Sequence, residues 1–393
     1  KQPDIFAATQ LFFPQTGPGG ASILTPDPSA ANVAGTIGNP DLGPEVGQEI
    51  EIGFDASMFE GRVATSFTYY SRVTKDAIIP KTVPPSLWAP ENNEPSSPVQ
   101  FVNVGQTSNW GTEMTLNIQA ITEGPARLDI DVAFTTQNNR IDDMGGIERI
   151  QEGRSRAHFQ GYPIAVASDK RVMSADFVSG DRGSVTNIMC DGGTGTQITK
   201  SDGSTYGADF GGALVPCADA PRLVWGSTDP TRLLNVTPTF TILENWRVSA
   251  NFDAMWGHWM AHDYATARYT SHPTSKAVWL QDDPLAMGYI ATTRNGFGFS
   301  KAGFLKLREI SLGYNFSQGI ADMIGASSAN VRVGARNVAR LWLQDEWAGD
   351  DRLKYDEPVS DPEIGRSVYN FAGEDGGGWP PIPQWTVRFG VTF

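Results

Sequence analysis

The connections between candidate strands constrain this chain more than any other feature. Short connections lie at 59–61, 122–125, 243–245 and 317–329. Long connections rich in Gly, Pro and Asp lie between them, at about 14–45, 80–97, 141–230, 260–301 and 342–383. Several long loops count against a soluble domain, whereas short turns at one end and long loops at the other are typical of a transmembrane β-barrel.

The segments between these connections alternate with the period of two-faced β-strands. In the clearest one, Ile50, Ile52 and Phe54 share one face, while Glu49 and Glu51 share the other. The same pattern predicts further strands at about 63–74, 113–120, 128–135, 232–242, 247–259, 302–316, 330–341 and 385–393, after an initial strand near 5–13. The total of about ten strands is even, as it is in such barrels.

One predicted strand is irregular. Leu305 and Leu307 lie out of phase with Ile310 and Leu312. Two explanations are open: a β-bulge near Arg308, because an extra residue shifts the alternation by one position, or an upper part of the strand that stands clear of the apolar layer.

Composition excludes several classes of protein. A formal net charge of −14 argues against nucleic acid as a partner, because phosphates would not be neutralised. The apolar fraction of 40% is enough for a folded chain, and no apolar run is long enough for a membrane-spanning helix. The first residues do not form a signal peptide. A soluble β-sandwich also has strands with one apolar face, so alternation alone leaves that fold open.

Several motifs in order resemble the C-terminal half of SusC/RagA-like TonB-dependent outer-membrane receptors. They are the segment NPDLGPE at 39–45, Tyr69-Tyr70 with Thr74-Lys75-Asp76, Asn103-Val104-Gly105 with Asn109-Trp110-Gly111-Thr112-Glu113, the segment FLKLREISLGY at 304–314, Ala335-Arg336-Asn337-Val338 and the terminal Phe393. The resemblance implies an antiparallel transmembrane barrel of about 22 strands. We therefore expect residues 1–393 to be its last ten or so strands, part of a longer protein whose plug domain is absent here.

The two cysteines, Cys190 and Cys217, lie in the longest predicted connection. One interpretation is a disulfide that stabilises an extracellular loop by about 3–4 kcal/mol, and the alternative is two unpaired thiols. They cannot form a four-ligand zinc site unaided. His258 and His262 have metalloprotease spacing, but Trp259 occupies the position next to His258 where that motif has a glutamate. We predict no metal, no cofactor and no catalytic residues.

Aromatic residues suggest two further roles. Six aromatic residues near strand ends are candidates for an aromatic girdle, with core filling as the alternative: Trp246, Trp256, Trp259, Tyr264, Trp342 and Trp385. Those in the long connections are candidates for ligand contact: Trp88, Trp279, Trp347 and Trp379. In the last strand, Trp385, Phe389 and Phe393 resemble the signal read by the barrel-assembly machinery.

The resemblance implies TonB-dependent import of a large nutrient, a glycan or a peptide, across the bacterial outer membrane. Its implied partners are the TonB–ExbB–ExbD complex through the missing N-terminal region, a SusD-like surface lipoprotein, the barrel-assembly machinery and outer-membrane lipid. The long loops would be extracellular and the C-terminus periplasmic. The acidic face of Glu49, Glu51 and Asp55 would disfavour polyanions. An adhesive surface protein and a soluble carbohydrate-binding sandwich are the alternatives.

Overall fold

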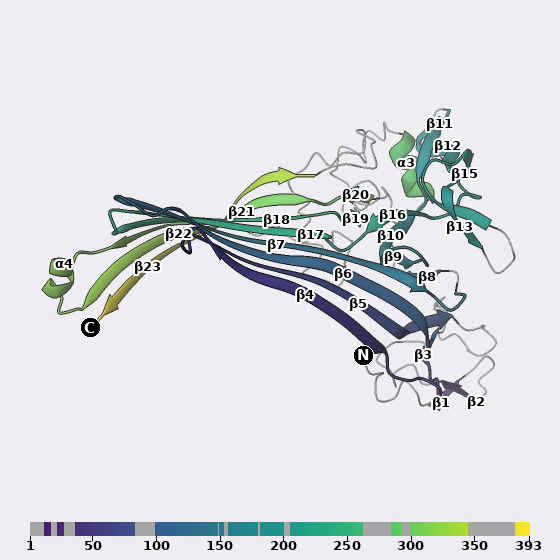
Figure 1. Cartoon of the computed structure of the whole chain (residues 1–393). Coiled ribbons are helices and arrows are strands. Elements are labelled where there is room, and N and C mark those ends of the chain that lie inside the picture. The colour runs from purple at the N-terminus through teal and green to yellow at the C-terminus, as the bar shows by residue number, and fades with distance from the viewer. Residues whose placement is uncertain are drawn as a thin grey trace.

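The computed structural model describes residues 12–16, 22–26, 36–82, 99–147, 149–152, 156–179, 181–199, 205–261, 284–292, 299–344 and 382–393. Its main feature is one curved, open antiparallel sheet, here called the wall (Figure 1). The wall strands, in spatial order, are β4 (Val46–Met58), β5 (Val63–Thr82), β6 (Val99–Ile121), β7 (Ala126–Asp143), β17 (Arg232–Ile242), β18 (Trp246–Trp256), β21 (Phe304–Asn315), β22 (Ser328–Leu343) and β23 (Gln384–Thr392). The short strand β3 (Thr36–Ile37) pairs in parallel with β6.

The two ends of the wall differ, as the connection lengths predict. At the turn end, short turns and the helix α4 (Gln318–Met323) join neighbouring strands. At the loop end, the chain between β7 and β17 forms a separate lobe (Figure 1). The described part of the chain contains no helix that is both long and apolar enough to span a membrane.

The lobe contains several small sheets and one helix. Its strands are β8 (Ile150–Glu152), β9 (Arg156–His158), β10 (Val166–Asp169), β11 (Val172–Val178), β12 (Asp181–Asp191), β13 (Thr194–Thr199), β14 (Thr205–Asp209), β15 (Leu214–Pro216) and β16 (Leu223–Ser227). The pair β19 (Trp259–Ala261) and β20 (Phe299–Lys301) and the helix α3 (Pro284–Thr292) pack against these strands. The long connection predicted at 141–230 is therefore a folded unit. A further hairpin, β1 (Phe12–Thr16) with β2 (Ser22–Pro26), lies near the N-terminus.

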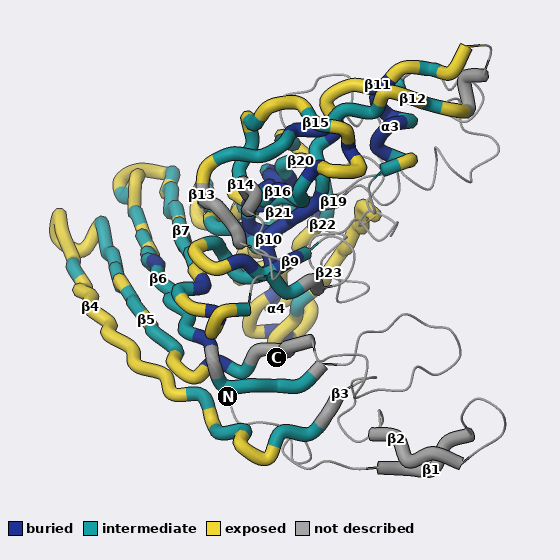
Figure 2. The backbone as a smooth tube through the Cα atoms, turned by 90° about the vertical axis from the view of Figure 1, so that its right-hand side faces the viewer, coloured by how far each residue is buried: buried dark blue, intermediate teal, exposed yellow. Residues whose placement is uncertain are grey.

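Buried residues are concentrated in the lobe, and most residues of the wall are exposed or half-buried (Figure 2). In the lobe, Phe159, Leu223 and Trp225 are buried around small cores. On the wall, Ile52 is 68% exposed and Phe389 is 74% exposed. Among the described residues, no second sheet covers the apolar face.

Cross-strand register places the apolar side chains on one face of the wall. Residues directly opposite in a sheet share a face, and one such row joins Phe54, Phe67, Met114, Phe134 and Leu234 across five strands. The residues that alternate with them form a polar face. The wall therefore has one apolar and one polar surface over its whole width.

Of the two explanations for the irregular strand, the structure shows the β-bulge at Arg308. Phe252 pairs with Leu307 and Asn251 pairs with Glu309, so Arg308 has no opposite residue on β18. The Arg308 guanidinium donates to Asp253 Oδ2 from Nε at 2.9 Å and from Nη2 at 2.7 Å. This extra residue brings Leu307 back onto the apolar face and explains the broken alternation.

Several strands are longer than predicted. β5 continues to Thr82, β6 begins at Val99 and β7 ends at Asp143. Apolar and polar residues alternate only where the two faces of a strand meet different surroundings. The strand itself continues beyond that part, so the alternation gives too short a length. The predicted initial strand at 5–13 lies outside the described residues except for Phe12 and Phe13, which belong to β1.

Candidate functional site

Two hollows lie at the loop end, where the lobe meets β6 and β7. The larger, of about 570 Å³, is called the carboxylate hollow and is lined by Gln106, Ser108, Arg140, Asp142, Gln160 and Gly161. The smaller, of about 380 Å³, is called the amide hollow and is lined by Tyr70, Asn109, Trp110, Gln137, Asn138, Asn139, Arg140, Gly161, Pro163, Ser227, Asp229, Pro230 and Thr231. The two hollows adjoin, because Arg140 and Gly161 line both.

The amide hollow depends on a glycine in the wall. Tyr70, Gly111 and Gln137 lie in one register row across β5, β6 and β7. A Cβ at Gly111 would lie 2.7 Å from the Tyr70 hydroxyl and would also clash with the carbonyl oxygen of Thr136. Only glycine therefore lets the tyrosine ring lie over β6.

Hydrogen bonds from β7 hold the lobe over the amide hollow. Gln137 Nε2 donates to the carbonyl of Pro230 at 2.7 Å, and the Ile164 amide donates to Asn139 Oδ1 at 2.6 Å. Two backbone bonds join Ile141 to Gly161 and Tyr162 where β17 no longer pairs with β7. The hollow thus has one side on the wall and one on the lobe.

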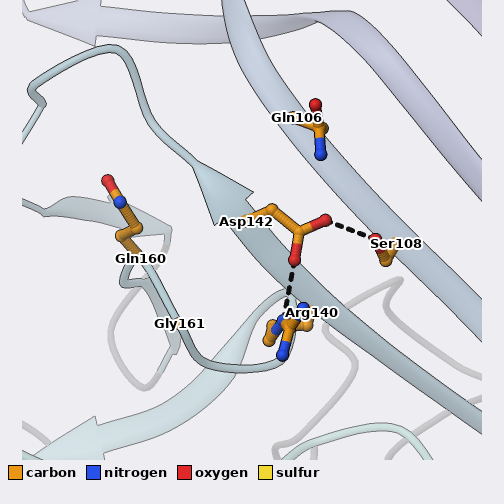
Figure 3. Close-up of a pocket in the computed structure, with 6 residues that line it drawn as sticks. All are labelled: Gln106, Ser108, Arg140, Asp142, Gln160 and Gly161. Carbon is orange, nitrogen blue, oxygen red and sulfur yellow. Dashed lines mark hydrogen bonds and ion pairs between the residues drawn. The ribbon is translucent and has the colours of Figure 1, made fainter.

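The carboxylate hollow is organised around Asp142 (Figure 3). Its Oδ1 accepts a hydrogen bond from Arg140 Nε at 2.7 Å, and its Oδ2 accepts one from the Ser108 hydroxyl. Partial burial on its own would raise the pKa of Asp142. The hydrogen bonds from Ser108, Arg140 and Gln106, with the charge of Arg140, outweigh it and hold this pKa below its usual value.

These hollows offer hydrogen bonds rather than reactive groups. Amide and hydroxyl side chains dominate the lining, and Tyr70 and Trp110 add two aromatic rings. The single carboxylate of the carboxylate hollow is neutralised by Arg140. Among the described residues, no group of three His, Cys, Asp or Glu side chains is placed to hold a metal ion. The chemistry suits a polar ligand rich in hydroxyl or amide groups.

The predicted pairing of Cys190 with Cys217 is confirmed. The bridge links β12 to the segment after β15 and is buried in a lobe core with Val172, Leu285 and Tyr289. The ligand-contact candidates Trp88, Trp279, Trp347 and Trp379 all lie outside the described residues.

Aromatic residues border the apolar face at both ends. At the turn end, the rings of Trp246 and Tyr314 lie 4.5 Å apart. At the loop end, Trp256 is ten residues farther along β18 on the same face. At about 3.3 Å per residue and a tilt of about 40°, this separation corresponds to a band about 25 Å tall, the height of the apolar band of outer-membrane barrels.

Not every aromatic residue proposed for the girdle has that position, and Tyr264 lies outside the described residues. Trp259 packs in the lobe against Trp225, with ring centroids 6.0 Å apart. In β23, Trp385 and Phe389 face outward with 78% and 74% exposure, and Phe393 follows the strand at 87% exposure. Their proposed role in barrel assembly stays a prediction.

Sequence reasoning missed the hollows. Tyr70, Asn109, Gln137 and Asn139 were not among the predicted site residues, although Gln137-Asn138-Asn139-Arg140 is a wholly polar run at a strand end. A polar run that continues a two-faced strand was therefore the sequence feature that could have located the hollows.

Comparisons with known proteins agree with this architecture. Residues 5–253 match the family described as TonB dependent receptor-like, beta-barrel. TonB-dependent receptor P26 of Formosa agariphila is 24% identical over 385 residues, which cover 91% of this chain and 36% of that protein. TonB-dependent receptor P3 of the same organism is 22% identical, with coverage of 90% and 35%. The chain thus spans about a third of the length of these relatives.

Solved structures show the same fold. The RagAB peptide importer in its "closed-closed" state superposes with a TM-score of 0.68 at 17% identity, covering 98% of this chain and 38% of that one. Its "open-open" state gives a TM-score of 0.67, with 99% and 38% covered.

Proposed function

Because this chain belongs to the TonB-dependent receptor β-barrel family and is SusC/RagA-like, we propose that it forms part of an outer-membrane importer for a large polar nutrient. The observation that carries the proposal is the apolar face of the wall. It is exposed, bordered by aromatic rings and as tall as the hydrocarbon layer requires. An exposed apolar surface of this kind is stable in contact with lipid.

The difference between the two ends of the wall supports an orientation of the receptor in the membrane. Short turns are typical of the periplasmic side and long excursions of the extracellular side. In our proposal the lobe therefore lies outside the cell, and the end of β23 reaches the periplasm. The Cys190–Cys217 bridge in the lobe suits an exported segment.

The proposed ligand meets the receptor at the amide hollow. Tyr70 and Asn109 contribute from the wall, and Asp229 contributes from the lobe. An amide-rich lining with two aromatic rings can bind the hydroxyl groups of a glycan or the backbone of a peptide. The four tryptophans Trp88, Trp279, Trp347 and Trp379 remain proposed ligand contacts in the long connections.

The proposed partners follow from the family. TonB, in complex with ExbB and ExbD, would supply energy through a region outside this chain, and a SusD-like lipoprotein would cover the loop end. The barrel-assembly machinery would recognise the strand that ends at Phe393. No catalytic role is proposed for any residue.

Uptake by the intact receptor tests this function. Cells that express it should accumulate labelled glycan or peptide fragments only when TonB is present. The substitution Asn109→Ala should reduce uptake several-fold, because the side chain lines the hollow, whereas Ser66→Ala on the same face nearer the turn end should not. Surface binding of the fragments with no TonB-dependent uptake would contradict the proposal and favour an adhesive surface protein.

A further inference from the structure

Three strands of the wall extend beyond its apolar face at the loop end. β17 begins at Arg232, which is opposite Thr136 on β7, whereas β7 continues to Asp143. β6 and β5 continue beside it, because Gln106 on β6 is opposite both Asp143 and Lys75. The apolar face therefore has a polar extension on these three strands, next to the lobe.

The change from apolar to polar side chains can be followed along β6. Every second residue of a strand lies on the same face, and the pairing of β6 with β5 has no register shift between Gln106 and Ile118. The residues of β6 that share the face of Phe67 and Phe134, in order toward the loop end, are Leu116, Met114, Thr112, Trp110, Ser108 and Gln106. Apolar side chains are thus followed by an aromatic ring, then by a hydroxyl and an amide.

The carboxylate hollow lies on this polar extension (Figure 3). Arg140 is opposite Ser108, so the two residues share the face of Trp110. Asp142 is on the same face, because its carboxylate accepts hydrogen bonds from both of them. Gln160 of the lobe lines the hollow from the other side. The hollow therefore lies on the side of the wall that faces lipid, directly above the apolar residues.

The position of the hollow corresponds to the depth of lipid head groups. A strand rises by about 3.3 Å per residue, and a tilt of about 40° reduces this rise to about 2.5 Å along the membrane normal. Ser108 and Gln106 therefore lie about 5 and 10 Å above Trp110. Head groups occupy about 5–8 Å on each side of the hydrocarbon layer, and tryptophan is enriched at its boundary. A lipid with its acyl chains against Met114 and Phe134 would have its head group at the hollow.

The residues that line the carboxylate hollow carry no net charge. Arg140 Nε donates to Asp142 Oδ1 at 2.7 Å, so these two charges neutralise each other. The other side chains of the lining are two amides and a hydroxyl, those of Gln106, Gln160 and Ser108. A phosphate would need cations that are not already paired, whereas amides and a hydroxyl suit the hydroxyl groups of a sugar.

We infer that the carboxylate hollow binds the sugar head group of an acylated glycolipid in the outer leaflet of the membrane. The inference rests on the proposed position of the wall in the membrane and adds a lipid site to it. The hollow is continuous with the apolar face, so one molecule can place its sugar in the hollow and its acyl chains below. This continuity favours a lipid over a free saccharide. The two hollows thus serve different molecules, the amide hollow the nutrient and the carboxylate hollow a membrane lipid.

Lipid binding to the intact receptor in detergent micelles tests the site. Three probes are compared by native mass spectrometry: a diglucosyl diacylglycerol, a phosphatidylglycerol with the same acyl chains, and the free diglucose head group. The glycolipid should bind about fivefold or more tightly than the phosphatidylglycerol, and the free head group should not bind measurably.

A double substitution removes hydrogen-bonding groups from both sides of the hollow. Gln106→Ala with Gln160→Ala should weaken glycolipid binding about fivefold to tenfold, because one amide is lost from the wall and one from the lobe. Binding of phosphatidylglycerol should stay the same. A matched control is Gln48→Ala. Gln48 shares the register row and the face of Ser108 but lines neither hollow, so this variant should bind all three probes as the unaltered receptor does.

Photo-crosslinking in bilayers locates both ends of the lipid without any substitution. A glycolipid with a diazirine on its sugar should label residues 106–108, 140–142 and 160–161. A glycolipid with the diazirine in the middle of an acyl chain should label residues 114–118 and 130–134. Sugar crosslinks confined to the polar face of the wall would contradict the inference.

Three binding results would also overturn the inference. They are equal or tighter binding of phosphatidylglycerol, binding of the free head group as tight as that of the glycolipid, and unchanged glycolipid binding in the double variant. TonB-dependent uptake by the same receptor is measured separately. Uptake without any preference for glycolipid would reject the lipid site alone, whereas an absence of uptake would refute the proposed importer and leave a measured glycolipid preference in place.

Discussion

The wall and the lobe follow opposite rules of burial, although they belong to one chain. In the lobe, large apolar side chains such as Phe159 and Leu223 are fully buried. On the wall, side chains of the same kind are exposed on one face, and polar residues occupy the other. The hydrophobic effect depends on the surrounding solvent. The difference therefore indicates that the lobe folds in water and the wall in lipid.

Removing the disulfide should separate the stability of the two regions. The double substitution Cys190→Ser with Cys217→Ser is expected to destabilise the lobe by about 3–4 kcal/mol through the lost constraint on its unfolded state. Hydrogen exchange of the intact receptor should then show faster exchange in β11, β12 and β15. Equal acceleration in β17 and β18 would mean that wall and lobe unfold together.

A charge on the apolar face should destabilise the wall. Val236 faces Val132 and Phe252 midway between the two aromatic ends of β18. Val236→Arg is expected to cost about 2–4 kcal/mol, as arginine does at the middle of the bilayer on the lipid face of a barrel. Urea titration of the receptor folded in lipid vesicles measures this cost.

The neighbouring substitution Thr237→Arg is the matched control. Thr237 lies on the polar face beside Asn235 and Asn251. Its replacement should cost less than half as much. Similar costs at both positions would mean that the two faces do not meet different surroundings.

Gly111 tests how closely the site is packed on the wall. Gly111→Ala should destabilise the receptor by about 1–3 kcal/mol, because the new methyl group overlaps Tyr70 and the Thr136 carbonyl. It should also weaken ligand binding at the amide hollow. Gly313→Ala, where the nearest atom would be 3.8 Å away, should have little effect on stability.

Asp142, at the junction of the wall and the lobe, predicts how the stability of the receptor depends on pH. Its pKa is lower in the folded state, so the stability it contributes is present above its unfolded pKa and is lost as pH falls through the folded pKa. Thermal denaturation of the receptor should therefore show a small loss of stability below about pH 4. Asp142→Asn should reduce that loss, and an unchanged pH profile would contradict this role.

The sequence predicted the wall better than the lobe for a physical reason. Alternation along a strand reports two different surroundings, so β4, β17, β18 and the bulge at Arg308 could be located. The lobe strands are short and pack in several directions, which leaves no simple period. The disulfide was predicted because only two cysteines are present.

The site was harder to predict because it is made from distant segments. Gln137 and Pro230 meet only when the lobe folds back on β7. Tyr70, Gly111 and Gln137 share one row only through the register of three strands, which alternation alone does not give.

Spin labels at Val236 and Thr237 test the central claim most directly. Each residue is replaced by a labelled cysteine in the intact receptor, reconstituted in bilayers, and the accessibility of the label to oxygen and to a water-soluble nickel complex is measured. The label at 236 should be relaxed mainly by oxygen, which concentrates in lipid, and the label at 237 mainly by the nickel complex. The reverse pattern, or equal access of the nickel complex to both labels, would contradict a wall with one face in lipid and one in water.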